Sequence, residues 1–239
     1  MNIIYKKSEI AFAILWIVIY IVALSTADNL SANIGVEKLI TLPACILLTA
    51  ILVIWIYRNR HSEKYGLCAP KVPASRLLFY IPLVIMASVN LWFGITMNLT
   101  ILESILYILS MLFVGFLEEM IFRGLLFQAM CKDNVKTAII VSSITFGIGH
   151  MVNLFNGSGA DLFSNLLQVC YAIAAGFLFT ILFYKTKSLW ACIITHGVLN
   201  ALSVFANEAA MTPVREVITA VALIVISLAY AVYISKKNH

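Results

Sequence analysis

The chain of 239 residues is 62% hydrophobic and only 11% charged, and its mean hydropathy is +1.00. Soluble domains are about 45–50% apolar and about 25% charged, so the composition excludes a soluble protein and indicates an integral membrane protein. The net charge of +5 comes from basic residues that lie between apolar segments, so no nucleic-acid partner is predicted. The five cysteines show no paired spacing, which argues against a disulfide framework.

Eight apolar segments predict an all-α, polytopic membrane helix bundle with about eight transmembrane helices. Segments near 20 apolar residues suit helices through a hydrocarbon layer of about 30 Å, and they lack the alternation of barrel strands. No hydrophilic stretch separates them, so residues 1–239 are expected to form a single integral membrane domain. The segments cover residues 10–24, 39–57, 77–93, 101–130, 137–154, 162–184, 188–206 and 214–234.

The first segment has a second interpretation. It follows Lys6 and Lys7, and Ser25-Thr26-Ala27 resembles a small-residue cleavage site, so it could be a signal peptide. The basic residues also predict an orientation. With the N-terminus in the cytoplasm, 13 of the 16 lysines and arginines fall in inner loops, and only Lys38 and Arg215 in outer loops. The positive-inside rule therefore predicts an N-in, C-in topology.

The fourth segment carries Glu118, Glu119 and Arg123 inside an apolar run. Each charge in a membrane span costs roughly 2.5–3.5 kcal/mol by insertion scales, so such residues point to a functional site. Glu119 and Arg123 are four residues apart and can pair on one helix face. Glu118 is rotated by about 100° from Glu119 and can face a cavity instead.

Two further segments each contain a histidine. His150 follows Phe146 and two glycines, with Asn153 one turn later, and His196 shares a helix face with Asn200. At about 1.5 Å per residue, these groups and Glu118 lie about 14–20 Å from the basic end of their helices. They are therefore expected at one depth, near the midplane or in the cytoplasmic half. A buried ion cluster that only locks helices together remains the structural alternative.

The sequences EEMIFR at 118–123, FGIGH at 146–150 and HGVLN at 196–200 resemble the three motifs of the CAAX-processing and bacteriocin-processing (CPBP, Abi/Rce1-like) family of intramembrane endopeptidases. The resemblance implies a catalytic core at about residues 101–206. It implies that Glu118 and His150 activate water, while His196 and Asn200 stabilise the oxyanion. Supporting roles fall to Glu119, Arg123, Asn153 and Phe146.

This resemblance implies hydrolysis of a membrane-associated peptide or protein, in the cytoplasmic membrane of a bacterium. Peptide precursors and membrane-anchored proteins are the expected substrates. No serine or cysteine is placed as a nucleophile, so water is favoured. No metal or other cofactor is expected, since no HExxH is present; the alternative is zinc held by Glu118, His150 and His196.

Two other functions stay open from the residues alone. The chain could be a non-proteolytic immunity or scaffold protein that binds its partner within the lipid bilayer. It could also be a small transporter in which Glu118 and the histidines relay protons. Internal repeats would favour a transporter, and none are visible in the sequence.

Overall fold

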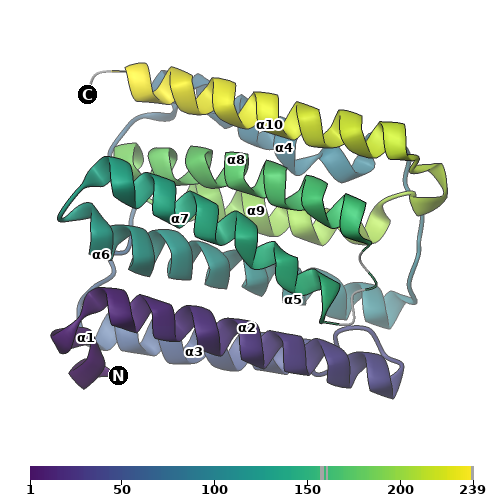
Figure 1. Ribbon diagram of the computed structural model, residues 1–239, viewed down its shortest axis with the longest axis horizontal. Helices are drawn as coiled ribbons and strands as arrows, with labels where there is room; N and C mark the ends of the chain where they lie inside the picture. Colours follow the sequence, from purple (N-terminus) through teal and green to yellow (C-terminus); the bar gives the residue numbers. More distant parts are fainter. Residues whose placement is uncertain (157–158, 160, 238–239) are drawn as a thin grey trace.

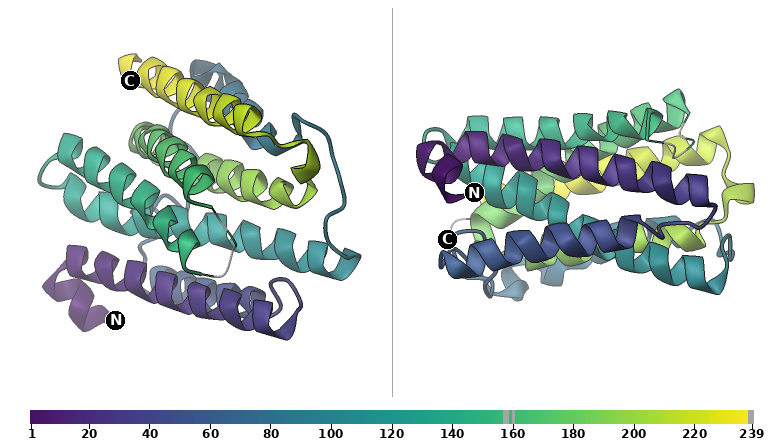
Figure 2. Two further views of the ribbon diagram at one scale, coloured as in Figure 1. Left: turned by 45° about the vertical axis from the view of Figure 1, so that its right-hand side comes forward. Right: turned by 90° about the horizontal axis from the view of Figure 1, so that it is seen from below.

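The computed structural model describes residues 1–156, 159 and 161–237. Two layers of roughly aligned helices, some neighbours parallel and others antiparallel, form the bundle, with both termini at one end (Figures 1 and 2). One layer contains α2, α7, α8 and α10, and the other contains α3, α5, α9 and α4. The described residues contain no β-strand, only an isolated bridge between Ile95 and Ala206. The predicted all-α membrane bundle is confirmed.

Six helical stretches in the described residues are long and apolar enough to cross a membrane. They are α2 (Glu9–Ile34), α3 (Thr41–Arg58), α5 with η3 and α6 (Ile101–Glu118, Glu119–Phe127 and Gln128–Cys131), α7 with η4 (Val135–Gly149 and His150–Leu154), α8 (Leu162–Thr186) and α10 (Pro213–Lys236). The remaining helices are α1 (Asn2–Lys7), η1 (Ala74–Tyr80), α4 (Ile81–Ala87), η2 (Val89–Leu91), α9 (Trp190–Leu202), η5 (Ser203–Phe205) and η6 (Glu208–Ala210).

The other two predicted spans are helical but shorter. Segment 77–93 is broken, because Leu78 and Tyr80 adopt positive φ and the α-helix begins only at Ile81, before Pro82. Proline lacks an N–H and is tolerated in the first helical turn, where that group has no partner. The seventh segment forms α9, which continues into η5.

The first predicted span continues beyond its expected end. Helix α2 begins at the cap residue Ser8, whose side chain accepts from the Ala11 amide, and ends at Gly35 in the left-handed conformation. The small residues 25–27 lie inside this helix and not in an extended segment. Because α2 packs against α3 and η3, the first apolar segment is an integral part of the bundle.

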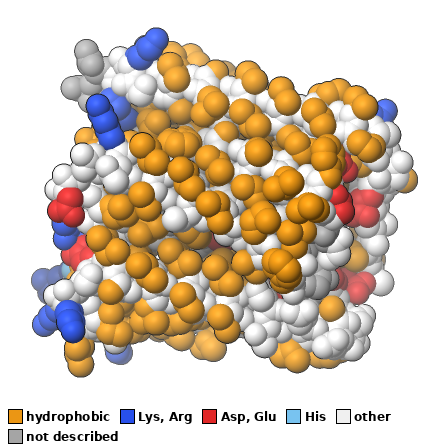
Figure 3. Space-filling model, viewed as in Figure 1, with side chains coloured by type: hydrophobic (Ala, Val, Ile, Leu, Met, Phe, Trp, Pro, Cys, Tyr) orange, Lys and Arg blue, Asp and Glu red, His pale blue; other side chains and the backbone are white. Residues whose placement is uncertain are grey.

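Basic and acidic side chains separate along the bundle axis. Figure 3 shows lysine and arginine gathered at the end that carries both termini, whereas acidic side chains dominate the far end. The flank between the ends is almost continuously hydrophobic, as a surface facing lipid requires. This distribution agrees with the alternation of charge in the loops on which the predicted topology rests.

Glycines allow two pairs of helices to touch backbone to backbone. A Cβ atom at Gly115 of α5 would lie 2.6 Å from the Gly197 nitrogen of α9, closer than real contacts permit. Gly147 of α7 also lies against the backbone of α8, because a Cβ atom there would meet the Ile173 nitrogen at 2.9 Å. Close approach through small residues is typical of membrane helix packing. The first contact sets the distance between the Glu118 and His196 backbones.

We therefore expect Gly115→Ala to lower stability by about 1–3 kcal/mol, because the methyl group meets rigid backbone. Thermal unfolding of the purified protein in detergent measures the effect. Gly149→Ala is the matched control, since its Cβ would meet nothing nearer than Phe122 Cζ at 3.9 Å. Equal melting temperatures for the two variants would contradict the backbone contact.

Candidate active site

The two adjacent glutamates lie at a change of helix type. Helix α5 ends at Glu118, and residues Glu119–Phe127 continue as a π-helix, η3. The wider turn is supported from α7, where the Ser142 hydroxyl donates to the Phe122 carbonyl at 2.8 Å. Such π-turns are rare and frequently mark functional sites. Glu118 lines a cavity here, whereas Glu119 is completely buried, so the two carboxylates face different surroundings, as predicted.

Glu119 is the centre of a buried charge cluster. Its Oε1 atom accepts a hydrogen bond from Arg123 Nη1 at 3.0 Å and another from His196 Nδ1 at 2.8 Å. The side chains of Glu119 and Arg123 are both fully buried. The predicted pairing of Glu119 with Arg123 is confirmed, and His196 on α9 joins the same carboxylate.

Phe146 is the surface on which this cluster packs. The Arg123 guanidinium lies 4.1 Å from the centre of the Phe146 ring and 5.7 Å from that of Phe179. The imidazole rings of His150 and His196 meet Phe146 edge-on, with centroid distances of 5.0 and 5.6 Å. Arg123 Nε and Nη2 make no hydrogen bond, so the aromatic faces provide their electrostatic compensation.

Glu118 is held from two sides. The Tyr20 hydroxyl on α2 donates to Glu118 Oε1 at 2.6 Å, the short distance typical of a hydrogen bond to an ionised carboxylate. His196 Nε2 lies 3.3 Å from Glu118 Oε2, at ion-pair distance but without hydrogen-bond geometry. His196 therefore bridges the two neighbouring glutamates, with Nδ1 on Glu119 and Nε2 facing Glu118.

His150 lies across the cavity, at the start of η4. Its Nδ1 atom is 3.1 Å from the Phe146 carbonyl, which can only accept, so Nδ1 carries the proton. A neutral His150 therefore keeps Nε2 as a proton acceptor. The backbone is fixed as well, because Asn165 of α8 donates to the His150 carbonyl at 3.0 Å. The ring of His150 thus bonds within its own helical segment, and its Nε2 atom makes no hydrogen bond to another described residue that would tie two helices together.

The cavity has a volume of about 310 Å³ and lies between the two helix layers. At about 30 Å³ per molecule it is large enough for about ten waters. Glu118, His150 and Asn200 line it, together with Tyr20 and Asn153. Four chain segments far apart in sequence thus contribute polar groups to one space, large enough for water, inside an apolar bundle.

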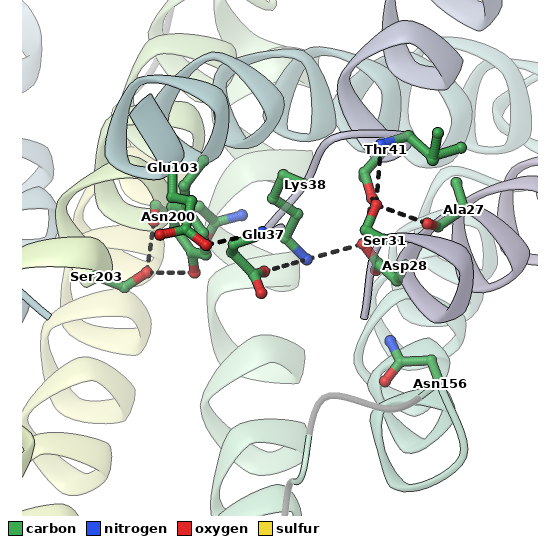
Figure 4. Close-up of polar contacts among 12 residues, drawn as sticks. Ala27, Asp28, Ser31, Glu37, Lys38, Thr41, Glu103, Asn156, Asn200 and Ser203 are labelled. Atoms are coloured by element: carbon green, nitrogen blue, oxygen red, sulfur yellow. Dashed lines mark hydrogen bonds and ion pairs between the residues drawn. The ribbon is translucent and has the colours of Figure 1, made fainter. Parts of the chain in front are cut away.

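The far end of the cavity is a polar network around Lys38 (Figure 4). Lys38 Nζ is 2.8 Å from Asp28 and 3.4 Å from Glu37, and the Thr41 hydroxyl also donates to Asp28 at 2.6 Å. Burial disfavours the charged form of Lys38, but Asp28 outweighs this and holds the pKa of the ammonium group above its usual value. Lys38 is therefore a permanent cation in the cavity wall.

The remaining predicted site residues lie around this arrangement. The Asn153 amide donates to Gln168 at 3.0 Å, so this residue ties η4 to α8. Asn200 lines the cavity, whereas His196 lies behind Glu118 with its ring nitrogens facing two carboxylates.

The alternative zinc set does not fit this arrangement. Among the described residues, no group of three His, Cys, Asp or Glu side chains is arranged to hold a metal ion. The Nδ1 atom of His150 is engaged by its own helix, and both nitrogens of His196 face carboxylates. Glu118, His150 and His196 would all have to reorient before they could share one ion.

Tyr20 is the site residue that the sequence did not reveal. It lies 98 positions before Glu118, in a span whose other residues read as ordinary apolar helix. Its ring is only 8% exposed, and its hydroxyl makes the shortest contact to the Glu118 carboxylate. The one available signal was a hydroxyl within an apolar run, and tyrosine is too common in membrane helices for that signal to be specific.

These features define a multi-pass membrane protein with a carboxylate, an imidazole and an amide lining a cavity within the bundle, and a second imidazole behind the carboxylate. Residues 100–202 match the family described as Type II CAAX prenyl endopeptidase Rce1-like, which confirms the resemblance carried by the three motifs. The chain is also 27% identical over 206 residues to the "Putative membrane peptidase YdiL" of Bacillus subtilis (strain 168), covering 80% of this chain and 78% of that protein. Both matches support a membrane protease.

We expect Tyr20→Phe to lower kcat for peptide cleavage about ten- to a hundredfold, since a hydrogen bond to a charged group contributes about 1.5–3 kcal/mol. KM should stay nearly constant, because the ring remains in place. The matched control is Tyr57→Phe on an exposed part of α3, where neither constant should change. A Tyr20→Phe enzyme with unaltered kcat and melting temperature would show that this contact does not position Glu118.

Proposed function

We propose that the protein is an intramembrane endopeptidase in which Glu118 activates a water molecule. The observation that carries the proposal is that the two adjacent carboxylates have different surroundings. Glu119 is neutralised by Arg123 and His196, whereas Glu118 faces a cavity across which His150 keeps an unprotonated nitrogen. A protein that needed charges only to lock its helices would have no use for the second glutamate.

The chemistry follows from these positions. Glu118 accepts a proton from water as the water oxygen attacks the carbonyl carbon of the scissile peptide bond. The proton then passes to the leaving amine, either from Glu118 or through His150 Nε2, as the carbon–nitrogen bond breaks. Tyr20 donates to Oε1 of Glu118 and His196 Nε2 lies 3.3 Å from Oε2, so both carboxylate oxygens are held in position.

Stabilisation of the tetrahedral oxyanion is assigned to Asn200 and His196. The Asn200 amide lines the cavity and can donate directly. His196 Nε2 contributes when Glu118 carries the proton taken from water, because its ion-pair partner is then neutral. Removal of a single hydrogen-bond donor of this kind typically lowers kcat by about 10²–10³-fold. Phe146 and Arg123 support the site by fixing both imidazole rings.

Glu118→Gln, His150→Ala and His196→Ala should each reduce cleavage by about 10²–10⁴-fold, the range expected for loss of an acid–base group. Glu118→Gln should still accumulate in membranes, because the amide keeps the size of the side chain and Glu119 still balances Arg123. Glu208→Gln, an exposed change of the same kind, is the control.

Comparative peptidomics of membranes from wild-type and Glu118→Gln cells measures the effect and identifies the substrate. Full activity of Glu118→Gln would favour the scaffold interpretation. Failure of all three variants to accumulate would favour the interpretation as a structural ion cluster.

The mechanism is proposed to need no metal ion, so chelators should leave peptide cleavage unchanged. Membranes treated with EDTA or 1,10-phenanthroline, and then washed, provide the measurement. Activity that is lost on chelation and restored specifically by zinc would overturn the metal-free mechanism, since it would require Glu118 and the histidines to converge on one ion.

A further inference from the structure

The cavity occupies only one half of the bundle. From Glu118 near the middle, it extends to Lys38 in the turn between α2 and α3, and past Asn90 and Ser203 where α4 and α9 end. Its lining includes none of residues 58–76, 132–136 or 185–189, which form the connections at the opposite end. The sequence predicted site residues near the midplane or in the cytoplasmic half, and this depth applies to Glu118. The cavity extends from Glu118 only toward the end with the α2–α3 turn.

The end reached by the cavity is the one away from both termini. Figure 1 shows the α2–α3, α4–α5 and α9–α10 connections together at this end, and the termini at the other. Hydrogen bonds from the Glu37 amide to Glu103 and from Thr96 to the Phe205 carbonyl join these connections. The mouth is thus formed by several chain segments that meet on one side of the membrane.

The two ends carry opposite charge. Thirteen lysines and arginines and three acidic residues lie at the end with the termini, whereas two basic and six acidic residues lie at the end with the cavity mouth. Basic residues are retained on the cytoplasmic side of membrane proteins, so this excess identifies the closed end as the cytoplasmic one. Figure 3 shows the same segregation in space.

We propose that the cavity is entered from the side of the membrane opposite the cytoplasm. The site of a peptidase would then act on exported polypeptides, or on the parts of membrane proteins that lie outside the cytoplasm. This substrate class rests on the proposed function; the side of entry does not, because it follows from cavity shape and charge alone.

Cysteine accessibility tests the side of entry. Ser25→Cys and, in a second variant, Met111→Cys introduce a thiol into the cavity wall. The background keeps Cys45 and Cys192, which are fully buried, and replaces Cys68, Cys131 and Cys170. Ser62→Cys, in the connection at the closed end, is the matched control. The probe is a permanently charged trimethylammonium methanethiosulfonate, which does not cross membranes.

We expect the probe to react with both cavity thiols in intact protoplasts and with Ser62→Cys only in inside-out vesicles. Reaction of the cavity thiols from the cytoplasmic face alone would overturn the proposal, as would protection from both faces with reaction only in detergent. The measurement does not depend on catalysis and can be repeated in the Glu118→Gln background. Its failure is therefore distinguishable from failure of the proposed function.

The substrate class has a separate readout. Peptidomics of the medium and of the non-cytoplasmic face of the membrane should find peptide fragments in wild-type cells that are absent from Glu118→Gln cells. If the fragments that depend on Glu118 derive from cytoplasmic segments instead, the assigned substrate class is wrong even though peptidase activity is established.

Discussion

The fold depends on the burial of Arg123. A guanidinium in the centre of an apolar bundle is stable only if its charge is matched, and Glu119 one helical turn away provides the match. His196 joins the same carboxylate from α9, and the ring of Phe146 on α7 covers the guanidinium. One cluster thus connects η3 with α7 and α9. Removing one member would leave a buried charge without a partner, which typically costs about 3–5 kcal/mol.

The same cluster explains how two neighbouring carboxylates come to differ. Glu119 has its charge neutralised within the protein and no exposed surface, so it is a structural group. Glu118 has instead a tyrosine hydroxyl on one oxygen and a cavity beside it. As neighbours on one helix, the two side chains point in directions about 100° apart. Glu118 is therefore positioned by its contacts with Tyr20 and His196.

Local spacing predicted most of this arrangement, because membrane helices restrict where polar groups can go. The four-residue interval between Glu119 and Arg123 gave their pairing, and the common depth of Glu118 and His196 gave their proximity. Three features needed tertiary contacts. Tyr20 lies on a distant helix; the π-helix depends on the Ser142 hydroxyl; and the sharing of His196 between two carboxylates follows from the Gly115–Gly197 contact. The break at Pro82 was visible in the sequence, but its position was set by the preceding residues with positive φ.

Hydrolysis within a membrane requires water at the peptide bond without a path for ions through the bilayer. The charge cluster meets both requirements, since it forms the inner boundary of the cavity and is itself fully packed. On one side of it lie Glu118, His150 and a space for water; on the other lie the buried aromatic residues Phe127 and Phe183. A cavity that opened at both ends would expose Arg123 to solvent and weaken its interaction with Glu119. The single mouth that we propose is thus compatible with the buried charges that hold Glu118 in place.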